Sequence, residues 1–196
     1  MQHIRPLQDH PEFTIREYSG WTEYRVENWR LARDGSHKVV RGYGWSWLDP
    51  LIPLVTAVCW QTISNTRLYS FLYTLLIGTY VYSKCTNVLW ESVIVIHSFG
   101  IQYETHRGLP GIPLLMSRHF IPLTCLQDFV INEGLHGWNV RYYLAALEQS
   151  PHGTISLHVP FENILPHFPV LLEVYQEVQE MVFQRPSGAS TDEQPH

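Results

Sequence analysis

The sequence predicts an α+β fold in which a two-helix membrane hairpin precedes an antiparallel β sandwich or barrel capped by a C-terminal helix. Three observations support it: two apolar runs in the first half, short alternating segments after residue 90, and one amphipathic stripe near the end. The predicted units are an N-terminal cytosolic segment (1–44), the membrane hairpin (45–88), the β-domain (89–184) and a disordered tail (185–196).

Composition excludes several classes of protein. Of the 196 residues, 45% are apolar, 13% aromatic and only 16% charged, against a usual charged share of about 25%. The net charge of −5 argues against nucleic-acid binding. The three cysteines (Cys59, Cys85, Cys125) are odd in number and far apart, which argues against a disulfide framework or a zinc ribbon. The polar first forty residues contain no signal peptide that we recognise.

The N-terminal segment predicts two short strands. Thr14–Tyr18 and Tyr24–Trp29 are rich in β-branched and aromatic residues, and Ser19-Gly20 between them is typical of a turn. A second turn is expected at residues 34–36.

The membrane hairpin is predicted from Leu51–Trp60 and Leu68–Tyr82. A spanning helix needs about 20 residues, so the first run would extend over 45–63 and the second to Val88. The alternative is a pair of buried helices in a soluble domain. Basic residues flank the hairpin more than its turn, which would place both termini in the cytosol. They are Arg30, Arg33, Lys38, Arg41 and Lys84, against Arg67 alone in the turn.

Several segments after residue 90 have strand character. Glu91–Ser98 and Ile101–Thr105 predict a hairpin around Phe99-Gly100. Arg107–Ser117 contains two prolines and two glycines and is expected to be a loop. Further strands are expected at Phe120–Leu123, Leu126–Glu133, Val140–Leu147 and Thr154–Val159, with Gly134–Asn139 and Pro151–Gly153 as connections.

The C-terminal helix is the clearest single element. Apolar residues at helical spacing form one stripe, and glutamates occupy the other side. Pro166 and Pro169 suit the start of the helix. The stripe consists of Leu171, Val174, Tyr175, Val178, Met181 and Val182. About six meandering strands followed by one helix suggest a pleckstrin-homology-like architecture.

Catalytic and cofactor motifs are not evident. The eleven histidines form no HExxH motif and no Cys/His pair at ligand spacing, so no metal site is expected. We find no nucleophile elbow and no glycine-rich phosphate loop, and we expect no cofactor. The chain is therefore expected not to be catalytic by itself.

A lipid-binding role is the competing interpretation. A phosphoinositide site needs clustered basic residues on the loops of the β-domain. The β-domain offers only Arg107, Arg118 and Arg141, of which the first two flank the predicted loop. A free-standing membrane-anchored lipid-binding adaptor therefore remains an alternative to a subunit of a larger enzyme.

Six segments, in order and with matching spacing, resemble the phosphatidylinositol glycan class H (PIG-H) family. The VINE segment followed by YYLAAL is the most specific pair. The segments are Glu91–Thr105, Phe120–Leu123, Val130–Glu133, Tyr142–Leu147, Pro151–Gly153 and Leu171–Val182. Residues 1–44 and the Arg107–His119 loop depart from the family pattern.

The resemblance implies a non-catalytic subunit of the phosphatidylinositol N-acetylglucosaminyltransferase complex, which carries out the first step of GPI-anchor biosynthesis. It implies the catalytic class A glycosyltransferase subunit as partner, with the class C, P, Q and Y subunits and membrane lipid. It also implies the endoplasmic reticulum membrane as the location, with the β-domain facing the cytosol. Carried over residue by residue, it indicates Asn132, Glu133, Tyr142 and Tyr143 as candidates for the partner interface.

Overall fold

The computed structural model describes residues 2–4, 7, 9–31, 39–41, 49–65, 67–109, 111–150 and 153–183. The turn expected at 34–36 and the tail expected at 185–196 lie outside these ranges. The chain forms two compact units, one made of residues 1–26, 92–104 and 118–196 and the other of residues 27–91 and 105–117. Strands β6, β7 and β8 have residues in both units.

The first unit contains most of the β structure. Six strands form one sheet in the order β1-β2-β3-β6-β7-β8, and three form another in the order β11-β10-β9. The bounds in the large sheet are β1 Gln2–Ile4, β2 Phe13–Tyr18, β3 Trp21–Glu27, β6 Val88–Ile96, β7 Gly100–Leu109 and β8 Ile112–Pro122. Those in the small sheet are β9 Leu126–His136, β10 Asn139–Gln149 and β11 Ile155–His158.

Helix α3 (Phe168–Phe183) packs on the small sheet in this unit. The side chain of Gln179 donates a 2.9 Å hydrogen bond to the backbone carbonyl of Phe129, which fixes the helix to β9. The buried stripe of α3 packs with side chains from both sheets in one core. The largest fully buried members of that core are Tyr24, Phe13, Phe129, Ile101, Ile121, Leu144 and Leu171. The amphipathic stripe read from the sequence is therefore the face that the helix buries.

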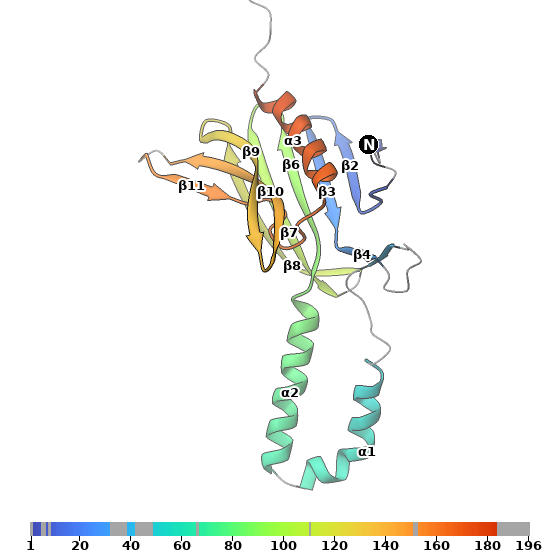
Figure 1. The fold of residues 1–196 in the computed structure, drawn as a ribbon. Coiled ribbons are helices and arrows are strands. Elements are labelled where there is room, and N and C mark those ends of the chain that lie inside the picture. The colour runs from blue at the N-terminus through green and yellow to red at the C-terminus, as the bar shows by residue number, and fades with distance from the viewer. Residues whose placement is uncertain are drawn as a thin grey trace, which may run out of the picture. The chain divides into compact units, whose positions relative to one another are not determined.

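The second unit contains α1 (Leu51–Asn65), α2 (Arg67–Cys85) and a two-stranded pair of β4 (Trp29–Leu31) and β5 (Val39–Arg41). The two helices follow one another along the chain and contact each other (Figure 1). Thr56 of α1 and Tyr73 of α2 are linked by a hydrogen bond between their hydroxyl groups.

The predicted fold class was wrong in its membrane hairpin. The structure consists mostly of antiparallel β sheets with three helices, and no helix in the described ranges is long and apolar enough to cross a membrane. Helix α1 has 15 residues, which at 1.5 Å per residue span about 22 Å, less than a hydrocarbon core of about 30 Å. Helix α2 has 19 residues, but its tyrosines, serines, threonines, Arg67 and Lys84 dilute its apolar character. Residues 45–48, which were to lengthen the first span, lie outside the described ranges.

The loop expected at Arg107–Ser117 was also wrong, because β7 and β8 continue through it as paired strands. A Cβ on Gly108 would lie only 2.3 Å from the carbonyl oxygen of Ile112, so glycine permits the close approach of the two backbones. Pro113 is tolerated because β8 is an edge strand. Gly111, at φ +82°, makes the reversal. Gly and Pro residues therefore mark the hairpin rather than interrupting it.

Strand pairing also departs from the expected segmentation of the chain. β2 and β3, from the predicted N-terminal segment, belong to the same sheet as β6–β8. The β9–β10 connection is shorter than expected, because β9 runs to His136 and only Gly137-Trp138 form the turn. The four predicted units themselves stay predictions.

Candidate partner interface

The four candidate interface residues lie opposite one another on two paired strands. Asn132 and Glu133 are on β9, and Tyr142 and Tyr143 are on β10. In the antiparallel register Tyr142 faces Glu133, and Tyr143 faces Asn132. Directly opposite residues in such a ladder have Cβ atoms about 4.5–5.5 Å apart, so the two pairs are neighbours. The structure brings all four predicted residues together.

Tyr142 and Glu133 form the outward polar pair of this group. The tyrosine hydroxyl donates a hydrogen bond to the Glu133 carboxylate, and this bond raises the pKa of Tyr142, with the negative charge of Glu133 adding to the effect. The Tyr142 ring lies 4.9 Å from the Phe168 ring of α3, at an interplanar angle of 55°. Such a tilted arrangement is a favourable aromatic geometry. Tyr142 is therefore held by its hydroxyl group and by its ring, while its side chain remains partly exposed.

Asn132 and Tyr143 differ in their surroundings. The side-chain oxygen of the exposed Asn132 accepts a 2.8 Å hydrogen bond from the backbone N–H of Glu133. Tyr143 is half-buried and lies over Gly134, where a Cβ would meet the ring at 3.0 Å. Its ring borders a cavity of about 270 Å³ lined by Gly134, Leu135, Arg141, Tyr143, Val159, Glu162 and Leu165. Asn132 thus shapes the local strand, while Tyr143 forms one wall of a small cavity.

The sequence reasoning missed the most exposed part of the same hairpin, which we call the β9–β10 tip: Leu135, Trp138 and Val140. Trp138 is completely exposed, at 102% of its reference area, and Leu135 is 84% exposed. Tryptophan and leucine at such positions are unusual unless a partner covers them. The signal in the sequence was a tryptophan beside a turn glycine, Gly137, which has φ +63°.

The edge strand β11 carries exposed apolar side chains of its own. Ile155 and Leu157 are 65% and 53% exposed. Both are on the outer strand of the small sheet, which pairs with Ala146–Gln149 at the end of β10 away from the β9–β10 tip. These two residues are therefore separate from the tip.

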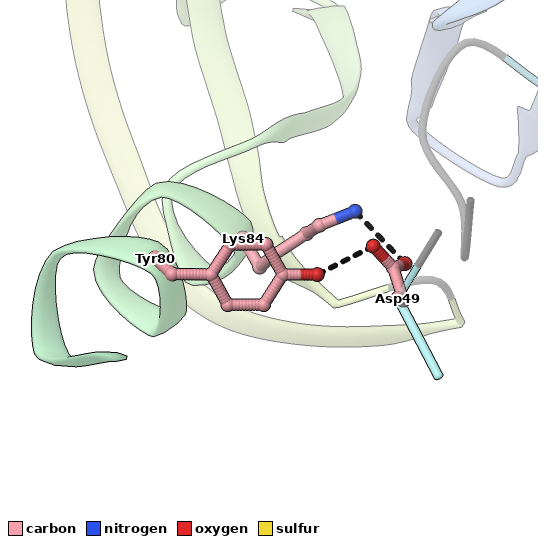
Figure 2. Close-up of polar contacts among 3 residues, drawn as sticks. All are labelled: Asp49, Tyr80 and Lys84. Carbon is pink, nitrogen blue, oxygen red and sulfur yellow. Dashed lines mark hydrogen bonds and ion pairs between the residues drawn. The ribbon is translucent and has the colours of Figure 1, made fainter. Parts of the chain in front are cut away.

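The helix pair of the second unit also carries exposed apolar side chains. No side chain of α2 is buried. Figure 2 shows the polar contacts that fix this pair: Asp49 accepts a 2.5 Å hydrogen bond from the hydroxyl of Tyr80 and forms a 3.0 Å ion pair with Lys84. Both partners come from successive turns of α2, and Asp49 itself is buried. The hydrogen bonds to Asp49 raise the pKa of Tyr80 and that of Lys84.

Many apolar side chains of these two helices are exposed. The exposed ones include Leu54, Val55, Val58, Leu68, Phe71, Leu72, Leu75 and Leu76. Burial of such side chains is favourable by about 25 cal/mol per Å² of apolar area. The helix pair therefore offers a second apolar surface that a partner would stabilise.

Metal-ligating side chains meet at one place among the described residues. His119, Glu148 and His158 come from β8, β10 and β11, and their ligand atoms all lie within 4.8 Å of one another. Sequence reasoning did not anticipate this group, because its members are far apart along the chain. Of the cysteines, Cys85 and Cys125 are free thiols, and the side chain of Cys59 lies outside the description.

Comparison with known proteins points to one family. Residues 92–162 match the family model described as the PIG-H component of the GPI-GlcNAc transferase complex. No solved structure matches the chain. The matched segment covers the later part of β6 through β11 and includes all four candidate interface residues.

Two curated relatives are named as subunits of a GlcNAc transferase. The chain is 36% identical over 87 residues to phosphatidylinositol N-acetylglucosaminyltransferase subunit gpi15 of Schizosaccharomyces pombe, covering 44% of this chain and 51% of the relative. It is 30% identical over 110 residues to the H subunit of the Homo sapiens phosphatidylinositol N-acetylglucosaminyltransferase, covering 55% and 56%. The chain thus spans about half the length of the curated relatives it matches. Residues 92–162 match the PIG-H family model, which confirms the resemblance to the PIG-H family drawn from the sequence.

Proposed function

We propose that this chain is a non-catalytic subunit of a phosphatidylinositol N-acetylglucosaminyltransferase complex. In that role it supports transfer of GlcNAc from UDP-GlcNAc to phosphatidylinositol, the first step of GPI-anchor biosynthesis. The PIG-H domain at residues 92–162 carries this proposal, because relatives with that domain are named as subunits of the transferase.

The exposed apolar surfaces support a subunit role. The β9–β10 tip projects a whole tryptophan side chain into solvent, and tryptophan and tyrosine are the residues most enriched at binding hot spots. Tyr142 and Glu133 lie on the same two strands and supply a directed polar contact at the edge of this surface. An apolar centre with a polar rim is the usual anatomy of a protein interface.

The proposed partner is the catalytic class A glycosyltransferase subunit, in a complex with the class C, P, Q and Y subunits. This assignment follows the family resemblance. The endoplasmic reticulum membrane, with the β-domain facing the cytosol, is proposed as the location on the same basis. The distribution of basic residues does not support this orientation, because that argument requires spanning helices.

The test is complementation of cells that lack their own PIG-H protein. The full-length tagged chain is expressed, its partners are identified after purification in mild detergent, and GlcNAc transfer to phosphatidylinositol is assayed. We expect the class A subunit to co-purify with activity, and the chain separated from it to be inactive. Transfer by the isolated chain, or restored activity without any association, would contradict the proposal.

A matched pair of variants makes this test specific to the surface. Leu135→Glu places a charge on the β9–β10 tip and is expected to reduce co-purification of the class A subunit. Phe99→Glu changes a residue that is similarly exposed, at 69%, in the β6–β7 turn and is expected to behave as the unchanged chain. Equal losses for both variants would show that the tip has no special part in assembly.

The lipid-adaptor alternative receives less support from the described residues. Arg118, one of the three arginines available for a phosphate, is already bound to Glu104 at 2.7 Å. Glu104 also accepts a 2.7 Å hydrogen bond from Gln102. The Arg118 guanidinium, already paired with this carboxylate, is therefore less available to a lipid phosphate. A chain that bound acidic liposomes but no transferase subunit would favour the alternative.

A further inference from the structure

Three side chains from three strands meet in the first unit: His119 of β8, Glu148 of β10 and His158 of β11. The Nε2 atom of His158 lies 2.9 Å from Oε2 of Glu148, and the Nε2 atom of His119 lies 3.5 Å from the same oxygen. Both imidazoles therefore turn the same nitrogen toward one carboxylate oxygen. We propose that these residues form a binding site for a divalent transition-metal ion of the zinc type.

The strand register explains how the carboxylate and one histidine come together. Ala146 pairs with His158, and Glu148 pairs with Ser156, so Glu148 and His158 are diagonal neighbours on one face. Diagonal positions lie about 7–8 Å apart, within reach of two long side chains. His119 comes from the edge strand of the other sheet, so the group joins the two sheets.

The distances suit tetrahedral coordination. Zinc–nitrogen bonds of about 2.0–2.1 Å at tetrahedral angles place neighbouring ligand atoms about 3.3 Å apart. The two observed distances, 2.9 Å and 3.5 Å, lie on either side of that value.

The hydrogen bonding of His158 favours a metal over a simple ion pair. Its Nε2 atom is buried and makes no hydrogen bond to any described residue, although it lies 2.9 Å from a carboxylate oxygen of Glu148. A buried polar atom without a partner is uncommon in native proteins. An unprotonated nitrogen with a free lone pair is the form that coordinates a metal.

The two rings also pack against one another. The imidazoles of His119 and His158 are stacked, with centroids 4.1 Å apart and an interplanar angle of 26°. To bind one ion, the Nε2 lone pairs of the two rings must converge, so the rings would have to turn out of the stacked arrangement on binding. The ligand set of two imidazoles and one carboxylate suits zinc and similar ions, and magnesium and calcium prefer oxygen ligands alone.

The exposure of the group defines the rest of the site. The side chain of His119 is 47% exposed, whereas those of Glu148 and His158 are 23% and 29% exposed. The open side is that of His119, where water would supply the fourth ligand. The ion would then link the edge strand β8 to the small sheet. This link would stabilise the segment that matches the family model.

The test is zinc titration of the full-length chain, purified without a histidine tag and freed of metal with a chelator. Calorimetry is expected to show one zinc ion bound per chain, with an increase in the thermal midpoint. Cobalt substitution should give the absorption bands of a tetrahedral site. A chain that binds no zinc under these conditions would overturn the proposal.

Variants distinguish zinc binding at this site from nonspecific zinc binding by surface histidines. His119→Gln, Glu148→Gln and His158→Gln are each expected to weaken zinc binding by about 100-fold or more and to abolish the thermal shift. His97→Gln, at an exposed turn histidine, is the matched control and should bind as the unchanged chain. Unchanged binding in the three cluster variants would mean an adventitious ion only. His119→Gln is the decisive variant, because its exposed side chain can be replaced with little risk to folding.

Discussion

Tyr142 and Glu133 face one another across β9 and β10, and the tyrosine hydroxyl donates a hydrogen bond to the glutamate carboxylate. The pair lies within the segment that matches the PIG-H family model, on the hairpin whose turn carries the completely exposed Trp138. A polar contact that is already formed in the free subunit loses less conformational entropy when a partner binds. The pair therefore presents a prearranged polar rim to the proposed partner.

Replacement of Glu133 should change the titration of Tyr142. In Glu133→Gln the charge disappears and the hydrogen bond weakens, so the raised pKa of Tyr142 should fall toward its ordinary value of about 10. An NMR titration of the labelled tyrosine ring measures this. Glu180→Gln on α3 is the control. A Tyr142 pKa that is the same in Glu133→Gln and in the unchanged chain would contradict the pairing.

Buried tyrosines should make the first unit sensitive to alkali. Burial, with the charge of Glu177 as the next cause, raises the pKa of Tyr24, and burial with the charge of Glu148 raises that of Tyr103. The folded state therefore holds these protons more tightly than the unfolded state, whose tyrosines titrate near pH 10. The stabilisation is fully present below about pH 10 and is lost as the pH rises further.

The variant Tyr24→Phe tests this directly. The Tyr24 hydroxyl that is removed donates a long 3.7 Å hydrogen bond to the sulfur of Met181, so the unfolding free energy at pH 8 should change by no more than about 1 kcal/mol. Between pH 8 and pH 11 the variant should lose less stability than the unchanged chain. Urea unfolding at both pH values measures the difference. Equal losses would show that ionisation of Tyr24 does not contribute.

Local sequence patterns predicted the helices and strands whose formation depends on nearby residues. The helical stripe from Leu171 to Val182 predicted α3, and alternation predicted most of β9 and β10. The pair VINE and YYLAAL located the candidate residues, although only the structure shows that Tyr142 faces Glu133.

Contacts between distant residues explain part of what sequence reasoning missed. Pro113 and Gly108 resemble loop residues in isolation, and pairing of β7 with β8 makes them strand residues. The apolar runs at α1 and α2 resembled spans, but their helix lengths and polar side chains do not support that interpretation. The group of His119, Glu148 and His158 has no spacing motif, because three strands from two sheets bring it together.

Truncation of Phe129 should strongly destabilise the chain. This side chain is fully buried between both sheets and α3. Phe129→Ala is expected to lower the free energy of unfolding by about 3–5 kcal/mol, since it leaves a cavity that the sheets cannot close. Phe99→Ala, at a side chain that is 69% exposed, should change it by no more than about 0.5 kcal/mol. Urea denaturation of both variants provides the comparison, and a small effect at Phe129 would contradict the described core.

Asp49 should control the protonation of two residues on α2. Asp49→Asn replaces the carboxylate whose hydrogen bonds, with its charge as a smaller contribution, raise the pKa of Tyr80 and of Lys84, so both pKa values should fall. Amide hydrogen exchange in the first turn of α1 should become faster, because that turn loses its contact with α2. Asp128→Asn, in the other unit, is the control and should leave both titrations and the exchange unchanged. Unaltered exchange in Asp49→Asn would show that this contact does not hold the helices together.

Truncation of Trp138 should separate assembly from folding. Because this side chain is completely exposed, Trp138→Ala is expected to change the unfolding free energy by no more than about 0.5 kcal/mol. If the β9–β10 tip is the centre of the proposed interface, the same change should weaken binding to the class A subunit by about 2 kcal/mol or more, a factor of about 30. Affinity is measured on the purified complex in detergent, with Phe99→Ala as the exposed aromatic control. A loss in both variants would point to a general defect, whereas full affinity in Trp138→Ala would move the interface away from the tip. In that case the apolar face of α2 becomes the surface to test, since none of its side chains is buried.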